Sequence, residues 1–205
     1  MTATLDRTTA PLPRTDHRAA PSLQAMSVIA GGVLFAIGNA LHPLEHNDAA
    51  LESPTWLAAH LTIGAGALLM AAGIGVLARR LAPSRLATIG LGVLWVGLVL
   101  MPIGSITEGY VARAMEHAQF HDFETSILWH SMLAGTSTLL GPLLIAIGAL
   151  RNRLLPVPVA LALPAITLGA LLVGVLPVEG YGIIPGTIVF GLGMAAAGWV
   201  SRRPA

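Results

Sequence analysis

The sequence contains no cysteine and no lysine, and only 10% of its 205 residues are charged. Without cysteine, the chain has no disulfide, no thiolate ligand for a metal ion and no cysteine nucleophile. A soluble globular domain carries about 25% charged residues, so the composition excludes that class. Apolar residues take the place of the missing charge, because 55% of the chain is hydrophobic and the mean hydropathy is +0.76.

Several catalytic and transport signatures are also missing. The sequence has no Gly-x-Ser-x-Gly motif and no glycine-rich phosphate loop, and no expected membrane span carries a charge at its centre. Proton-coupled transporters usually have an acid near the midplane, and ion channels usually have a polar pore lining. The titratable residues lie instead near the ends of the expected spans, so a functional site is expected there.

Six apolar runs are each long enough to cross a hydrocarbon core of about 30 Å as a helix rising 1.5 Å per residue. The expected spans are residues 23–42, 55–78, 86–107, 127–150, 158–178 and 183–200. Pro164, Pro177 and Pro185 interrupt the last two and predict kinks there. Residues 1–21, which are rich in Pro, Thr and Arg, are predicted to be a flexible cytoplasmic tail, and residues 22–201 a single membrane domain.

Arginine and acidic residues alternate between successive loops. Ten of the eleven arginines fall on one side of the predicted spans, eight acids fall on the other, and Arg113 is the exception. Cytoplasmic loops of membrane proteins are enriched in arginine and lysine. The pattern therefore predicts an all-α, polytopic plasma-membrane protein. It would be a bundle of six transmembrane helices, N-in/C-in, with loops rich in histidine and acid outside the cell.

Three histidines and one glutamate fall near one level at the outer edge of the expected bundle. Counting from the inner end of each span places His42, His60, Glu108 and His130 about 28–34 Å along their helices. Ionisable groups at membrane depth usually face a bundle interior or a water-filled cavity. Three imidazoles and a carboxylate suit a divalent transition metal such as zinc, iron or copper. Glu108 would be either a ligand or the general base for a metal-bound water.

The same histidines allow two other interpretations. A pair on facing helices, such as His60 with His130, fits the axial ligands of one b-type haem. No second histidine pair lies toward the inner side, so at most one haem is expected. Alternatively, the histidines are interfacial anchors, because rings that are partly apolar and partly polar gather at membrane surfaces.

The longest expected outer loop contains a second histidine pattern. His117 and His121 are spaced i,i+4 and Glu124 follows three residues later, so a helix would place all three on one face. The acid that zinc proteases carry between such histidines is missing. The segment is predicted to be an amphipathic interfacial helix, or a lid or secondary metal site shared with His46. Arg113 is a candidate contact for an anionic substrate group such as phosphate or carboxylate.

Three short segments, "GNALHP", "SPTWLAAHL" and "GIGVLARRL", resemble small multi-pass membrane proteins of actinobacteria that carry a domain-of-unknown-function label. The matching residues are His42, Pro43, Pro54, Trp56 and His60, together with the Glu-Gly-Tyr at 108–110. The resemblance implies a helical membrane fold and no established activity, so it assigns no role to these residues.

The leading prediction is an integral membrane protein with a transition-metal or haem site at the outer leaflet. As an enzyme it would act on a lipid-soluble small molecule by metal-assisted hydrolysis or oxidation. The alternatives are a non-enzymatic accessory or structural membrane subunit and a transporter of a hydrophobic compound. Expected partners are the lipid bilayer, a hydrophobic small molecule, and a second copy of the chain or a partner membrane protein. No nucleic acid is expected.

Overall fold

The computed structural model describes residues 22–202 except 46, 174 and 179, so the predicted tail at 1–21 lies outside the described residues. Every regular element in this part of the chain is a helix, which confirms the all-α prediction. The helices are α1 (Leu23–Leu41), α2 (Asp48–Leu51), α3 (Trp56–Gly73), α4 (Gly75–Leu81), α5 (Arg85–Ile106), the π-helix η1 (Thr107–Val111), α6 (Ala112–Ala114), α7 (His117–Ser126), α8 (Leu128–Asn152), α9 (Val157–Ala162), α10 (Ala165–Leu172) and α11 (Gly180–Ser201).

Five helical stretches are long and apolar enough to cross a membrane, namely α1, α3, α5 continued through η1 and α6, α8, and α11. The span expected at 158–178 is instead the shorter apolar segment formed by α9 and α10. Pro164 separates these two helices, because an interior proline lacks an N–H and clashes with the carbonyl one turn earlier. Pro185 lies within α11 without ending it.

Polar residues between the apolar runs set where helices begin. The Ser22 hydroxyl oxygen accepts a hydrogen bond from the backbone N–H of Ala25 at 3.2 Å, and Ser84 caps α5 in the same way through Ala87 at 3.3 Å. These bonds satisfy backbone donors that have no partner inside the first turn of a helix. The span expected at 55–78 is divided into α3 and α4 at Ile74.

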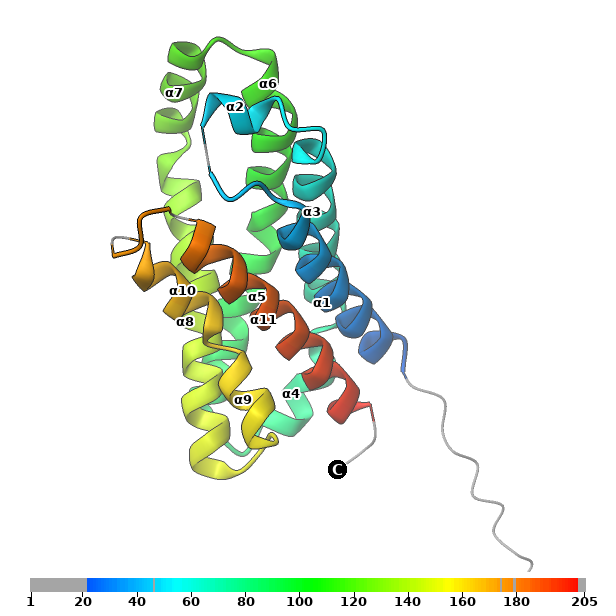
Figure 1. Cartoon of the computed structure of the whole chain (residues 1–205). Helices are drawn as coiled ribbons and strands as arrows, with labels where there is room; N and C mark the ends of the chain where they lie inside the picture. Colours follow the sequence, from blue (N-terminus) through cyan, green and yellow to red (C-terminus); the bar gives the residue numbers. More distant parts are fainter. Residues whose placement is uncertain (1–21, 46, 174, 179, 203–205) are drawn as a thin grey trace, which may run out of the picture.

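The long helices are arranged as a ring (Figure 1). Around it, α8 packs on α5, α5 on α3, α3 on α1, α1 on α11, and α11 on α10. At one end the ring is closed by α9, which contacts both α8 and α11. Toward the other end, α10 makes only sparse contact with α8. The ring therefore has its sparsest contact along the seam between α8 and α10, where the Thr167 hydroxyl donates a hydrogen bond to the Leu139 carbonyl at 2.7 Å.

Glycines allow the packed helices to approach closely. A Cβ atom on Gly141 of α8 would lie 2.5 Å from the backbone nitrogen of Leu94 in α5. Gly182 and Gly186, which form a Gly-x-x-x-Gly in α11, pack against Gly169 of α10 in the same manner. Small residues at such contacts are the usual basis of close helix packing in membranes.

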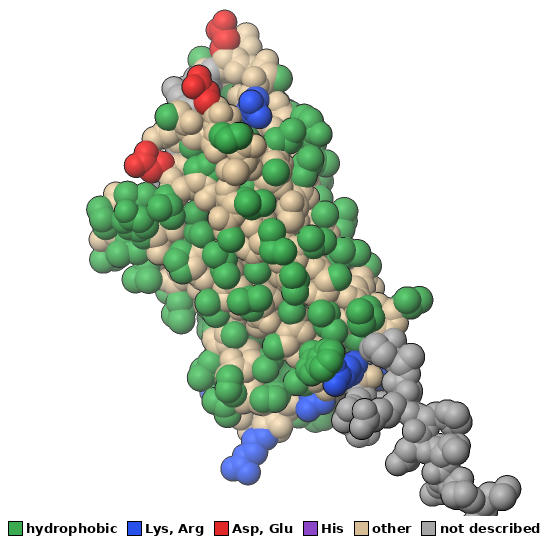
Figure 2. All heavy atoms as spheres, turned by 45° about the vertical axis from the view of Figure 1, so that its right-hand side comes forward, with side chains coloured by type: hydrophobic (Ala, Val, Ile, Leu, Met, Phe, Trp, Pro, Cys, Tyr) green, Lys and Arg blue, Asp and Glu red, His purple; other side chains and the backbone are tan. Residues whose placement is uncertain are grey.

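Charged side chains gather at the two ends of the molecule and leave an apolar band between them (Figure 2). The acidic end contains the described carboxylates of Glu45, Glu52, Glu108, Glu116, Asp122 and Glu124. The arginine end contains Arg79, Arg80, Arg85, Arg151, Arg153 and Arg202. Arg113 is exposed on α6, toward the acidic end, and is the exception to this separation.

The two halves of the molecule bury different kinds of residue. The acidic half consists of the described residues within 36–68, 99–139 and 165–189, which exclude 46, 174 and 179, and the arginine half of residues 23–35, 69–98, 140–164 and 190–202. Among the largest fully buried side chains of the described residues, all but Trp56 belong to the arginine half. Most of the buried polar residues belong to the acidic half, namely Asn39, His60, Ser105, Thr107, His130, Ser137, Thr138 and Thr187. The acidic half is thus where a polar site can be built.

Candidate binding site in the acidic half

One wall of the site is the irregular helix formed by α5 and η1. Pro102 lies inside α5, and the hydrogen-bond spacing then lengthens in η1, where the N–H of Ala112 bonds to the carbonyl of Thr107. Single π-turns of this kind occur frequently at functional sites. The turn brings the backbone of Glu108 to Trp56, whose indole Nε1 donates a hydrogen bond to the Glu108 carbonyl oxygen at 2.7 Å.

Three aromatic rings connect the ends of α1 and α3. The ring centroids lie 4.5 Å apart for Trp56 and His60, 4.9 Å for His42 and His60, and 5.2 Å for His42 and Trp56. A Cβ atom on Gly109 would lie 3.3 Å from the Cβ of His60, so η1 packs directly on this cluster. His42, His60 and the backbone of Glu108 therefore lie close together, as counting residues along the spans predicted.

The hydrogen bond made by His42 fixes the positions of its protons. Its Nδ1 lies 2.7 Å from the carbonyl oxygen of Pro43. A carbonyl oxygen only accepts hydrogen bonds, so Nδ1 carries the proton. In the neutral ring, Nε2 is then an acceptor.

His130, on the first turn of α8, is buried with 6% of its surface exposed. Neither of its ring nitrogens has a hydrogen-bond partner among the described residues. Burying a polar group without a partner is unfavourable, and such groups are normally satisfied by water or by a ligand. His130 is therefore the side chain in this half whose hydrogen-bonding capacity most clearly exceeds what the surrounding chain supplies.

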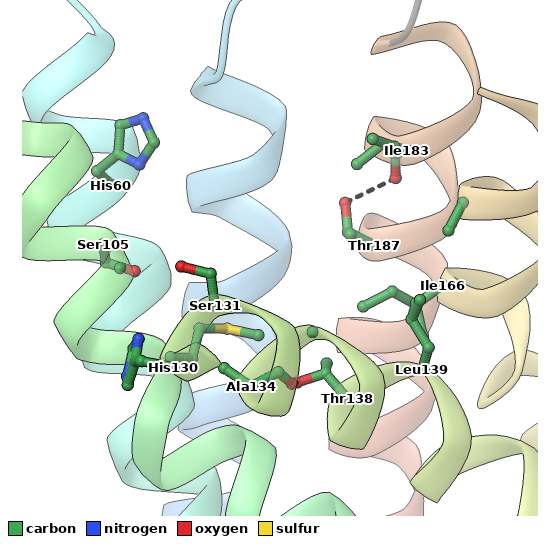
Figure 3. Close-up of a pocket in the computed structure, with 14 residues that line it drawn as sticks. His60, Ser105, His130, Ser131, Ala134, Thr138, Leu139, Ile166, Ile183 and Thr187 are labelled. Carbon is green, nitrogen blue, oxygen red and sulfur yellow. Dashed lines mark hydrogen bonds between the residues drawn. The ribbon is translucent and has the colours of Figure 1, made fainter. Parts of the chain in front are cut away.

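A cavity of about 370 Å³ lies among α3, α5, α8, α10 and α11. Figure 3 shows His60, Ser105 and His130 on one side of it and Ile183, Thr187, Ile166 and Leu139 on the other. The lining is mostly apolar. Thr138 and Thr187 donate their hydroxyl protons to carbonyls of their own helices. Cavities of about 300–1,000 Å³ with apolar walls and a few polar groups are typical of small-molecule sites.

Two glycines provide the space for this larger cavity. Gly104 of α5 and Gly135 of α8 both line it, and a Cβ atom on either would meet nothing within 4 Å. Gly97 and Gly141, in the same two helices, lie instead at the close contact between them. A glycine inside a helix destabilises it by about 0.5–1 kcal/mol relative to alanine. At Gly104 and Gly135 the missing side chain leaves open volume in the cavity and does not bring two helices into contact.

A smaller cavity of about 240 Å³ lies between α1, α3 and the start of α11. It shares His60 and Ile183 with the larger cavity, so these two side chains lie between the cavities. The carbonyl oxygen of Leu44 accepts a hydrogen bond from the N–H of Gly180 at 3.1 Å, which fixes one wall. A Cβ atom on Gly180 would collide with that oxygen, so this approach requires glycine.

The structure assembles only part of the predicted metal set. The rings of His42 and His60 are neighbours. His130 lies on the wall of the larger cavity, which it shares with His60 and not with His42. Within residues 22–202, the described side chains include no group of three or more His, Asp or Glu residues that could hold a metal ion. The described residues therefore supply two neighbouring histidines for a metal ion but not a complete set of ligands.

The residues predicted to form a lid or a secondary metal site are not brought together at the cavities. The loop expected to be helical is indeed α7, but His46 and the side chain of His117 lie outside the described residues. His121 is exposed and Glu124 is half-buried on α7, and Arg113 is exposed on α6. These last three residues line neither of the two cavities.

The sequence interpretation missed the apolar and glycine residues that shape the cavities, above all Gly104, Gly135 and Ile183. No signal in the sequence could have found them, because glycine and isoleucine recur throughout the spans.

The chain matches no protein-family model, no curated protein and no solved structure. A functional argument for this multi-pass helical protein therefore starts from the chemistry of the site.

Proposed function

We propose that this chain is an integral membrane protein that binds a lipid-soluble small molecule in the larger cavity. The observation that carries the proposal is a buried histidine, His130, without a hydrogen-bond partner in the described part of the chain, on the wall of a mostly apolar cavity. An apolar ligand body would contact the walls, and a polar group on the ligand would bond to the Ser105 hydroxyl and, after rotation of its enclosed ring, to His130. Either side chain can donate or accept.

The sparsely packed seam of the helix ring gives such a molecule a route from the bilayer. Contact between α8 and α10 is sparse, and both helices expose large apolar side chains, including Met132 at 62% and Leu168 at 57%. A lipid-soluble molecule entering here would not have to cross either charged end.

We also propose that the segment of α9 and α10 is the fifth of six membrane crossings and that the arginine end is cytoplasmic. The separation of arginines from acids supports this orientation. Because the chain has no cysteine, single cysteines at Ala49 and Ala82, both exposed, report the sidedness directly. A membrane-impermeant maleimide should label Ala49→Cys on intact cells and Ala82→Cys only after permeabilisation. The reverse pattern would overturn the orientation.

The binding proposal is tested by filling the cavity. Gly135→Leu would place a side chain into the open space of the cavity, whereas Gly92→Leu would add the same side chain at an α5 position that also has nothing within 4 Å and does not line the cavity. Small molecules extracted from the purified proteins would be compared by mass spectrometry. We expect one or more compounds to accompany the wild type and Gly92→Leu and to be lost from Gly135→Leu. Identical extracts from all three proteins would contradict the proposal.

A metal or haem site is the second candidate, favoured by the contact between the rings of His42 and His60 at 4.9 Å. A third protein ligand would require the side chain of Glu108 or His130 to move to this pair. Glu108 would then be a ligand or a general base for hydrolysis or oxidation of the bound molecule. Elemental analysis and visible absorbance of the detergent-purified protein test this. Near-stoichiometric zinc, iron, copper or haem that is lost in His60→Ala supports it, and full retention in His60→Ala ends it.

A further inference from the structure

We infer that the smaller cavity holds the polar head of the bound molecule and that this head is a protonated amine. The ligand class is then a lipid-soluble amine, with its ammonium group among Asn39, His42 and Glu45 and its apolar chain in the larger cavity. This inference rests on the proposed function of the larger cavity and assigns a chemical class to its ligand.

The two cavities are placed for a molecule with two chemically different parts. They share His60 and Ile183 as wall residues, so a chain that occupies both would have to pass between these two side chains. The larger cavity is lined mostly by apolar side chains and the two open glycines. The smaller one adds an amide, a second imidazole and a carboxylate, and it lies nearer the acidic end. An elongated amphipathic molecule fits this division better than a compact one.

The hydrogen bonds within the smaller cavity show which kind of head it accepts. The Asn39 amide Nδ2 donates to the carbonyl oxygen of Phe35 at 2.8 Å. This bond fixes the amide orientation, because a carbonyl oxygen cannot donate, and it leaves Oδ1 as an acceptor. The Asn39 amide therefore offers an acceptor, and a head group that binds it must supply a donor.

Charge selects a cationic donor over a neutral one. Glu45 lines the smaller cavity, and its Oε2 accepts a hydrogen bond from the Asn47 amide at 2.7 Å, which holds the carboxylate in place. The described wall of this cavity contains no arginine, and Arg113 on α6 is not part of it. A carboxylate or phosphate head would be repelled by Glu45, whereas an ammonium would be attracted and would supply up to three donors.

The test compares three probes that differ only in the head: tetradecylamine, tetradecanol and tetradecanoate. The full chain in phosphatidylcholine nanodiscs would be titrated with tritiated tetradecylamine, and binding to empty nanodiscs would be subtracted. We expect saturable binding that is displaced by unlabelled amine at lower concentration than by the alcohol, and least readily by the carboxylate. Equal displacement by amine and alcohol, or preference for the carboxylate, would overturn the inference. Absence of saturable amine binding would overturn it as well.

Two matched variants locate the head. Glu45→Gln removes the charge at the smaller cavity, and Glu52→Gln removes the charge of another exposed acid at the same end that lines neither cavity. An exposed ion pair contributes up to about 1 kcal/mol, so Glu45→Gln should weaken amine binding by about fivefold and leave alcohol binding unchanged. Glu52→Gln should bind both as the wild type does. An unchanged amine affinity in Glu45→Gln would overturn the inference.

The failure of this inference can be distinguished from failure of the proposed function. Gly135→Leu should reduce the binding of all three probes, because it fills the space that their common chain occupies. If Gly135→Leu still loses a co-purifying compound while the amine shows no advantage over the alcohol, the larger cavity remains a binding site and the amine head is wrong. If Gly135→Leu loses nothing, the larger cavity itself is not the site.

Discussion

The arginine half and the acidic half share the helices α1, α3, α5, α8 and α11, but their interiors are built differently. In the arginine half, glycines such as Gly90 and Gly141 lie against a neighbouring helix, and large apolar side chains fill the interior. In the acidic half, glycines such as Gly169 also lie against a neighbouring helix, but Gly104 and Gly135 lie against open space, and the interior contains two buried histidines. The comparison shows that large apolar side chains fill the arginine half, whereas the acidic half contains most of the buried polar residues and both cavities.

The two ends are also fastened differently. At the arginine end, the Arg80 guanidinium donates to the carbonyl oxygen of Leu154 at 2.7 Å and to that of Val200 at 3.0 Å, which joins α4, the α8–α9 connection and α11. At the acidic end, the ring of helices is held by the aromatic cluster and the bond from Trp56 to Glu108. The seam between α8 and α10 has sparse contact and a hydrogen bond from the Thr167 hydroxyl to the carbonyl oxygen of Leu139 at 2.7 Å.

The largest expected effect is a loss of stability at Gly141, which lies six residues after Gly135 in α8. Gly141→Leu places a side chain where even a Cβ atom would lie 2.5 Å from the Leu94 backbone. Because α5 and α8 would have to separate, we expect a loss of about 3 kcal/mol or more. Thermal unfolding in detergent should show a large fall in Tm or no folded protein.

The matched change at Gly135 should leave the Tm close to that of the wild type, because the added side chain enters open space and replacing a helical glycine is favourable by about 0.5–1 kcal/mol. Equal destabilisation by the two substitutions would remove the distinction between the halves, since it would mean that Gly135 is also a packing position.

A smaller effect is expected at the arginine end. Arg80→Lys keeps the charge but replaces a planar group with several donors by a single ammonium, so it cannot reproduce both bonds. Hydrogen bonds from charged groups contribute about 1.5–3 kcal/mol each, and we expect the variant to lose about 2 kcal/mol of unfolding free energy. Arg79→Lys, at an exposed neighbouring position, is the control. Matching denaturation curves for Arg80→Lys and Arg79→Lys would show that the two hydrogen bonds of Arg80 contribute nothing to the free energy of unfolding.

The smallest effect is expected at the acidic end. Trp56→Phe preserves an aromatic ring but removes the donor to the Glu108 carbonyl, which should cost about 1 kcal/mol. Amide hydrogen exchange should accelerate mainly in η1, where that carbonyl lies. Trp129→Phe, at a residue 68% exposed, is the control and should exchange like the wild type. Unchanged exchange in η1 after Trp56→Phe would mean that the π-helix is held by its own backbone alone.

The sequence predicted the helices well because breaks in hydropathy, capping serines and prolines act locally. The start of α1 at Leu23 and the interruption at Pro164 follow from such local rules. Counting residues along the spans also placed His42 near His60. The number of membrane crossings and their sidedness stay predictions.

The cavities could not be predicted, because they depend on how each helix is rotated about its axis. Apolar residues surround these helices on all sides, so the sequence carries no polar stripe that shows which face is buried. Nothing in the local sequence separates Gly135, which lines the cavity, from Gly141, which touches α5. The π-helix η1 could not be predicted from the sequence either, although Pro102 lies in α5, the helix that η1 continues.

The open glycines also affect how readily this protein can change. At Gly104 and Gly135, which line the larger cavity, an added Cβ atom would meet no atom of a neighbouring helix within 4 Å. If the proposed binding is correct, substitutions at these two positions would alter the size of the bound molecule and leave the fold intact. Recognition and folding would then be separately mutable, and the same scaffold could be adapted to ligands of different length.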